Sequence, residues 1–261
     1  MLAPTSLDPS FGTSNIEAVL TKVRGMVDAQ PKASPCSECR LQDSCLSSGF
    51  TQADERQFGA LVLSHRRVKQ GQALYRSGDP CGSVFLIRSG FIKTVVLHSD
   101  GREQVAGFYM AGEMLGLDGI ASGKHASDAT ALTDTDVCVL PYERLATTGH
   151  EAHTVQRHLY RMLSQEVVLK QSMMLLLGSM RADERVATFL LNLSQRFTAR
   201  GFSPSDFILR MTRDEIGSLL GMKLETVSRI FSKFQKAGVI RIAGKHVRIV
   251  SIEGLRAVIG H

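Results

Sequence analysis

Three cysteines lie within ten residues of one another, at Cys36, Cys39 and Cys45, in an otherwise polar segment. Thiolates at such short spacing are typical ligands of zinc or of an iron–sulfur cluster. A zinc site would normally add a second cysteine or histidine doublet, and the nearest histidine, His65, has no partner at ligand spacing. An irregular triplet completed by a distant cysteine therefore favours an iron–sulfur cluster, with zinc or a thiol switch as the alternatives.

The fourth ligand would be one of the two remaining cysteines, Cys81 or Cys138, and spacing alone does not choose between them. An odd total of five cysteines argues against a disulfide framework. The first 14 residues lack the basic and apolar regions of a secretory signal, and no apolar run approaches the roughly 20 residues of a membrane span. We therefore expect reduced thiols in a cytoplasmic protein that does not associate with membranes.

A second constellation lies near the C-terminus, on a helix predicted over residues 223–237. Glu225, Ser228, Arg229 and Ser232 share one face of this helix, because residues three and four apart are neighbours. In the major groove of DNA, arginine can donate to guanine, glutamate can accept from cytosine, and serine can bond to a base or a phosphate. We predict that Glu225, Ser228 and Arg229 read bases, and a surface ion pair between Glu225 and Arg229 is the alternative.

The elements around this helix predict a winged helix-turn-helix. Thr212 stands three residues before Glu215, the spacing of a capping box, and Gly221 ends the short helix that this box opens. Residues 239–250 have the pattern of a hairpin, which would form the wing. Residues 181–261 hold 14 lysines and arginines against 7 acidic residues, which suits a polyanionic partner. Phosphate contacts are predicted at Thr212, Arg213, Lys223, Lys233 and Lys245.

Two further elements must position these sites. Short β-type runs between about residues 50 and 145, punctuated by glycine and aspartate, predict a small antiparallel roll. A helix with heptad spacing follows, which either pairs with a second copy of the chain or packs on its own domain. Its seam residues are Val155, Leu159, Met162, Glu166, Leu169, Met173 and Leu176. Glu166 would place like charges opposite each other in a dimer, which predicts a weak dimer that is easily switched.

The sequence thus predicts an α+β chain of four parts. Residues 1–35 form an N-terminal tail, residues 36–150 a sensory domain, residues 151–179 a dimerisation helix and residues 180–261 the winged helix-turn-helix. Within the sensory domain, residues 36–48 carry the cysteine triplet and precede the roll. The sequence has no glycine-rich phosphate loop and no short motif of a serine hydrolase or metalloprotease, so we do not predict an enzyme.

Together these motifs resemble the CRP/FNR superfamily of bacterial transcription regulators, and specifically its oxygen-sensing FNR branch. The resemblance covers nearly all of residues 36–250. It is carried by the cysteine triplet and by four segments, FLIRSG at 85–90, VCVLP at 137–141, RF to GFSP at 196–204 and LETVSR at 224–229. It implies a β-roll like that of cyclic-nucleotide-binding domains, a long dimerisation helix and a C-terminal winged helix-turn-helix.

The resemblance also implies a cofactor, partners and site residues. The family's [4Fe-4S] ligands fall on Cys36, Cys39, Cys45 and Cys138, which leaves Cys81 as an additional cysteine. The family's base readers fall on Glu225, Ser228 and Arg229, which implies a homodimer on a palindrome with half-sites resembling TTGAT, and RNA polymerase as a further partner. Loss of the cluster in oxygen would then weaken the dimer and its hold on DNA.

The same superfamily contains cyclic-nucleotide sensors, in which a glutamate after a glycine binds the ribose and an arginine binds the phosphate. In this chain Gly116 is followed by Leu117, and residues 125–129 contain no arginine. A buried phosphate without a cation would be costly. The sequence therefore predicts no cyclic-nucleotide binding.

Overall fold

The computed structural model describes residues 58–146 and 153–260. The N-terminal part of this range is a β-roll of two four-stranded antiparallel sheets, with the strand orders β1-β8-β3-β6 and β2-β7-β4-β5. The strands are β1 (Ser64–Val68), β2 (Ala73–Tyr75), β3 (Ser83–Ser89), β4 (Phe91–Leu97), β5 (Glu103–Met110), β6 (Met114–Leu115), β7 (Asp128–Ala131) and β8 (Thr135–Pro141). The antiparallel roll predicted from the sequence is confirmed.

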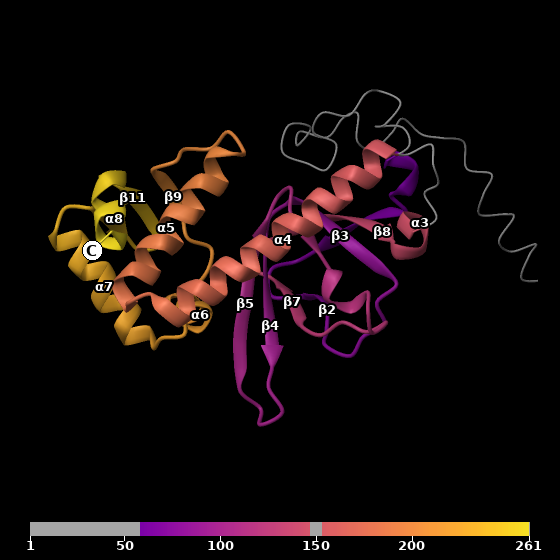
Figure 1. Cartoon of the computed structure of the whole chain (residues 1–261), viewed down its shortest axis with the longest axis horizontal. Coiled ribbons are helices and arrows are strands. Elements are labelled where there is room, and N and C mark those ends of the chain that lie inside the picture. Colours follow the sequence, from indigo (N-terminus) through magenta and orange to yellow (C-terminus); the bar gives the residue numbers. More distant parts are fainter. Residues whose placement is uncertain (1–57, 147–152, 261) are drawn as a thin grey trace, which may run out of the picture.

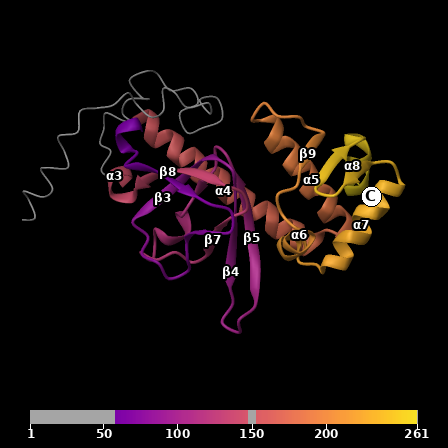
Figure 2. The same ribbon diagram turned by 180° about the vertical axis from the view of Figure 1, so that it is seen from behind.

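A single long helix, α4 (His153–Ser179), runs along the β-roll and leads into the C-terminal part of the chain (Figure 1). The short helix α3 (Tyr142–Ala146) precedes it after β8. Seen from behind, the β4–β5 hairpin extends down from the roll, and α6 lies beside the part of β5 nearest the C-terminal domain (Figure 2). The roll, the long helix and the C-terminal domain follow one another in the predicted order.

The C-terminal domain is a winged helix-turn-helix. Its elements are α5 (Ala182–Thr198), β9 (Asp206–Ile208), α6 (Arg213–Leu220), α7 (Leu224–Lys236), β10 (Ile240–Ala243), β11 (His246–Ile249) and α8 (Ile252–Ile259). Gly221 ends α6 at φ 65°, a left-handed conformation that glycine adopts without strain. Strands β10 and β11 form the predicted hairpin, and β9 completes a three-stranded sheet with them.

Apolar side chains gather in three core clusters. One fills the interior of the roll, and a second lies on the outer face of the β1-β8-β3-β6 sheet under α4. The third forms the core of the C-terminal domain, yet it includes Val105, Phe108 and Met110 from β5 of the roll. The roll and the C-terminal domain therefore share apolar packing.

Candidate nucleic-acid interface and cysteine site

Helix α7 separates its apolar and polar residues onto two faces. Val227, Ile230, Phe231 and Phe234 are buried in the C-terminal core. On the opposite face Glu225, Arg229 and Ser232 are exposed and Ser228 is half-buried. In the described part of the chain Glu225 and Arg229 form no ion pair, and the Arg229 guanidinium makes one long contact of 3.4 Å to Thr226 Oγ1. The predicted base readers thus lie together on one accessible face.

The residues predicted to contact phosphates have different surroundings. Thr212 is the N-cap of α6, and its Oγ1 accepts from the Glu215 backbone N–H at 3.1 Å, so the predicted capping box is present. Lys223 is the exposed N-cap of α7, and Lys245 is exposed in the turn of the wing. Lys233 is engaged within the chain, because its Nζ lies 3.0 Å from Asp183 Oδ2 on α5.

Arg213 is the least exposed of this set. Its guanidinium carbon lies 3.8 Å from the ring centroid of Phe231, a cation–π geometry that joins the start of α6 to α7. Burial lowers the pKa of Arg213, although an arginine remains charged at neutral pH. Within the described residues its Nη1 is buried without a hydrogen-bond partner.

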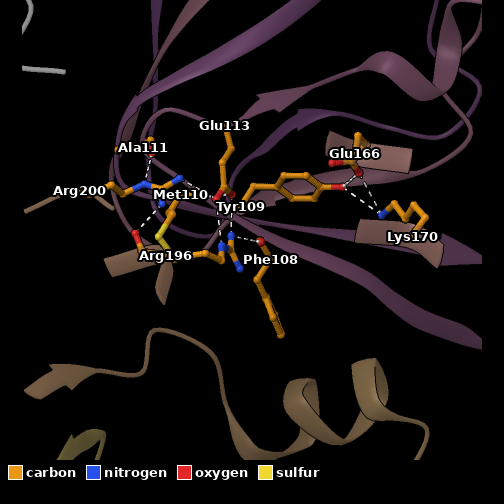
Figure 3. Close-up of polar contacts among 9 residues, drawn as sticks. All are labelled: Phe108, Tyr109, Met110, Ala111, Glu113, Glu166, Lys170, Arg196 and Arg200. Carbon is orange, nitrogen blue, oxygen red and sulfur yellow. Dashed lines mark hydrogen bonds and ion pairs between the residues drawn. The ribbon is translucent and has the colours of Figure 1, made fainter. Parts of the chain in front are cut away.

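Ion pairs that no sequence pattern predicted connect the C-terminal domain to the roll. Glu113, just after β5, receives hydrogen bonds from Arg196 Nη2 on α5 at 2.6 Å and from Arg200 Nη2, in the turn that follows α5, at 2.7 Å (Figure 3). Arg196 also donates to the Phe108 carbonyl, and Arg200 to the Ala111 carbonyl. The partners are more than 80 residues apart in sequence, so no local motif could have identified them.

Cys138 lies on β8, in the apolar cluster between the roll and α4. It is 6% exposed and packs with Phe58 and Leu86, and the α4 residues Leu159 and Met162 pack against the same cluster. Cys36, Cys39 and Cys45 lie outside the described residues. Phe58 is the thirteenth residue after Cys45, and a segment of that length can span up to about 45 Å when extended. Phe58 packs in the same apolar cluster as Cys138. The segment between Cys45 and Phe58 is therefore long enough for the cysteine triplet to reach Cys138.

A histidine and an arginine lie on the same side of the sheet as Cys138. His65 on β1 is the cross-strand partner of Cys138, so the two side chains share a face. Arg88 Nη1 lies 3.1 Å from His65 Nδ1. Since a guanidinium can only donate, Nδ1 is the acceptor and the imidazole is neutral. Burial and the Arg88 charge both lower the pKa of His65, in agreement with this assignment.

Cys81 has a different environment. Its Sγ lies 3.5 Å from the Gly116 carbonyl oxygen, and a Cβ at Gly119 would approach the Cys81 sulfur to 2.8 Å. Burial and the nearby Asp118 carboxylate raise the pKa of the Cys81 thiol, which disfavours a thiolate. Among the residues that the structure describes, no three histidine, cysteine or acidic side chains come together as a metal site.

Residues 125–129, which contain no arginine for a cyclic phosphate, contact other side chains of the roll. His125 is buried and stacks on Tyr75 with ring centroids 3.7 Å apart. The Asp118 carboxylate accepts from Ser127 Oγ at 2.7 Å and from the Ala126 N–H at 3.1 Å. The side chain that binds Ala126 and Ser127 is thus the acidic Asp118, whereas a bound phosphate would need a cation.

The heptad seam of α4 faces its own chain. Leu159 and Met162 pack on the outer face of the roll, Leu176 is buried in the C-terminal core, and Met173 packs against that core. Leu169 and Met173 line a small cavity between α4, β5 and α5. Glu166 accepts from Tyr109 Oη at 2.9 Å and pairs with Lys170 (Figure 3). The side chain of the remaining seam residue, Val155, is outside the described part.

A second apolar stripe on α4 is exposed. Tyr160, Leu163, Val167 and Met174 are 62, 39, 56 and 74% exposed. Their spacings of three, four and seven residues place them on one side of the helix, away from the roll. The heptad pattern therefore located the stripe that packs within one chain, and the exposed apolar stripe is a different set of residues.

The arrangement defines a class of protein, a winged-helix DNA-binding regulator joined to a β-roll by a long helix. Comparison with known proteins agrees. Residues 65–148 match the model of the cyclic nucleotide-binding domain, and residues 184–258 match that of the Crp-like helix-turn-helix domain. The chain belongs to the CRP/FNR family of transcription regulators, as the following relatives show.

The transcriptional activator protein anr of Pseudomonas aeruginosa is 44% identical over 234 residues, which cover 90% of this chain and 96% of the relative. The fumarate and nitrate reduction regulatory protein of Escherichia coli is 37% identical over 226 residues, covering 87% of this chain and 90% of the relative. The solved structure of FixK2 from Bradyrhizobium japonicum is 30% identical with a TM-score of 0.67, covering 75% of this chain and 96% of that one. Among the described residues, no helix has the length and apolar character that a membrane span requires.

Proposed function

We propose that this protein is a cytoplasmic, oxygen-responsive transcription regulator whose [4Fe-4S] cluster controls dimerisation and hence binding to a palindrome of TTGAT-type half-sites. The ligands would be Cys36, Cys39, Cys45 and Cys138. The regulator would act without enzymatic activity and without a cyclic nucleotide, and would contact RNA polymerase at the promoter. The relatives named as activators and as a fumarate and nitrate reduction regulator support this role in anaerobic gene control.

The observation that carries the proposal is the position of Cys138. Its side chain lies in the apolar cluster that joins the start of the described chain, at Phe58, to the α4 residues Leu159 and Met162. A bound [4Fe-4S] cluster would supply bonds that link the cysteine triplet to Cys138, and oxygen could destroy these bonds. Through these bonds Cys138 would hold the N-terminal segment beside the apolar side chains against which α4 packs on the roll. Cys81 lacks this connection, and its raised thiol pKa fits a structural cysteine.

The dimer contact is proposed on the exposed stripe of α4 and not on the heptad seam predicted from sequence. Contiguous exposed apolar residues mark protein interaction sites, and Tyr160, Leu163, Val167 and Met174 form such a stripe. Glu166 bonds with Tyr109 and Lys170 of its own chain, so in this proposal it would not face Glu166 of a second copy. The packing of α4 against the roll would instead determine how closely the exposed stripes of two protomers can pack together.

Bases would be read from α7, with Arg229 donating to guanine and Glu225 accepting from cytosine. Each dimer would place two such helices in successive major grooves, about 34–36 Å apart. Because two half-sites held by one dimer gain from effective concentration, loss of the dimer would cost far more than half of the binding. The zinc and thiol-switch alternatives keep this DNA-binding role and change only the sensor.

The test is to purify the protein without oxygen, measure its visible spectrum, iron and sulfide, and titrate a fluorescent operator before and after exposure to air. We expect four iron and four sulfide per chain, as in the [4Fe-4S] stoichiometry, with visible absorption and operator affinity lost together in air. Cys138→Ala should lack iron and sulfide, and the matched Cys81→Ala should retain both. The opposite result for these variants would overturn the ligand assignment, and zinc without sulfide would replace the cluster by a zinc site.

A further inference from the structure

The β4–β5 hairpin of the roll makes direct polar contact with α6, the first helix of the helix-turn-helix. Lys93 Nζ on β4 lies 2.7 Å from Glu215 Oε1, with only 25 and 16% of the two side chains exposed. The backbone N–H of Val105 on β5 donates to Ser218 Oγ at 2.8 Å. Glu215 and Ser218 are three residues apart, so both contacts lie on one face of α6.

One carboxylate performs two functions at this point. While Oε1 of Glu215 binds Lys93, its Oε2 accepts from the Thr212 backbone N–H at 2.7 Å and so caps α6. Burial alone would raise the pKa of Glu215, but the hydrogen bonds from Lys93 and from the Thr212 N–H outweigh it and the pKa is lowered. The sensor strand therefore holds the end of α6 that carries Thr212 and Arg213, two predicted phosphate contacts.

Movement of α6 must carry α7 with it. The turn between them is tight, since the Met222 N–H donates to the Gly217 carbonyl at 2.9 Å and a Cβ on Gly217 would lie 2.5 Å from the Met222 carbonyl oxygen. Arg213 on α6 also stacks on Phe231 of α7. The orientation of the base-reading face relative to the roll is thus set where α6 meets the hairpin.

We propose that Lys93, a residue of the sensor domain, is a positioning residue for DNA binding that acts through Glu215. The ion pair fixes the angle at which each helix-turn-helix leaves the roll, and so the fit of two recognition helices to two half-sites. This inference rests on the proposed operator binding. It adds to that proposal a defined contact through which the roll influences the DNA-binding helices.

Substitution of Glu215 separates this proposal from simple electrostatics. Glu215→Gln removes a negative charge beside a predicted phosphate contact, and charge alone predicts tighter DNA binding. Glutamine keeps the capping box, because its side-chain oxygen can still accept from the Thr212 N–H. It cannot form the ion pair with Lys93. We expect Glu215→Gln to bind the operator about five- to tenfold more weakly, within the usual range of coupling between sites.

The experiment titrates a fluorescent operator with anaerobically purified full-length protein, comparing the wild type, Lys93→Gln, Glu215→Gln and the double variant. Each single variant should lose affinity by a similar factor, and the double variant should be no weaker than either, because the same contact is lost once. Lys93→Arg keeps the positive charge that pairs with Glu215 and should bind the operator as the wild type does. Lys124→Gln, which removes the same charge from an exposed position on the roll, should bind as the wild type does.

Ser218→Ala gives a second measurement that changes no charge and should lower operator affinity by a smaller factor. Circular dichroism of each variant establishes that the comparison is made between folded proteins. Wild-type or tighter binding by Glu215→Gln, or losses that add in the double variant, would overturn the inference and leave the proposed function intact. A wild type that binds no operator would overturn the proposed function, and this inference with it.

Discussion

Helices α4 and α7 both bury one apolar stripe, and they differ in what they leave exposed. Helix α7 buries Val227, Ile230, Phe231 and Phe234 and presents polar residues, among them Glu225 and Arg229, to solvent. Helix α4 buries or half-buries its heptad seam and presents a second apolar stripe. A polar, partly cationic face suits nucleic acid, whereas an apolar face suits another protein surface.

In both helices the buried stripe fixes the position of the helix in the fold. The exposed stripe determines which kind of partner the helix can bind. The period of apolar residues located the buried stripe in both helices. In α7 the exposed face follows by subtraction, because its remaining residues are polar. In α4 the exposed face is also apolar, so the period alone could not assign either stripe to a partner.

The largest effect should come from breaking the exposed stripe of α4. Val167→Glu would place like charges opposite each other across a two-fold contact, because such an interface buries the same residue twice. We expect monomers in sedimentation velocity and an operator affinity lowered at least about 100-fold, since the two half-site contacts become independent. The proposed [4Fe-4S] cluster should still form, because its proposed ligand Cys138 packs with the buried residues Leu159 and Met162 of α4.

Gln165→Glu is the matched control, because Gln165 is exposed on α4 two residues away and points to the opposite side of the helix. It should remain dimeric and bind DNA normally. A Val167→Glu protein that stays dimeric would refute the assignment of the exposed stripe, and dissociation of Gln165→Glu would indicate that any added charge on α4 suffices.

A smaller effect is expected from the polar face of α7. Arg229→Ala should lower affinity for the operator by about 1–3 kcal/mol for each base contact that it removes, and should relax the preference at the guanine that Arg229 reads. Lys245→Ala, in the wing, should weaken binding to all sequences alike and reduce the salt slope by about 1. Anisotropy titrations on operator and substituted DNA at several salt concentrations measure both. Equal weakening of all sequences by Arg229→Ala would contradict base reading.

Local signals predicted much of the fold and of the DNA-binding surface. The capping box at Thr212 and Glu215, the break at Gly221 and the hairpin of the wing each depend on a few adjacent residues, and each is present in the structure. The strands at β3, β4, β5 and β8 were likewise marked by apolar runs between glycine and aspartate. Short-range chemistry decides these features, so a sequence pattern can specify them.

Features that depend on distant residues were not predicted. Lys93 and Glu215 are 122 residues apart, and Arg196 and Glu113 are 83 apart, so nothing in either neighbourhood marks the pair. Spacing left the fourth cysteine open between Cys81 and Cys138. Their surroundings differ only after folding, which buries Cys138 beside α4 and places Cys81 against Gly116. The ligand set itself remains a prediction.

The smallest effect, on the free energy of unfolding, should come from breaking the ion pair between Lys233 on α7 and Asp183 on α5. The hydrogen bond from Lys233 lowers the pKa of Asp183 below its ordinary value of 3.8. A lowered folded-state pKa stabilises the protein above 3.8, and this stabilisation is lost as the pH falls through the folded-state value. Because the Lys233 side chain is 66% exposed, solvent screening limits the contribution to less than about 1 kcal/mol.

Urea unfolding of the wild type and of Asp183→Asn measures this contribution directly. The variant should be less stable by that small amount at neutral pH, and the two proteins should converge as the pH is lowered through and below 3.8. Operator titration of the same variant also tests Lys233 as a phosphate contact. A Lys233 released from Asp183 should bind DNA more tightly if its side chain can reach a phosphate, and unchanged affinity would mean that Lys233 only fastens α7 to α5. In that case the DNA-contacting surface of α7 would end before Lys233. Lys233 would then serve only contacts within its own chain, as the heptad seam of α4 does.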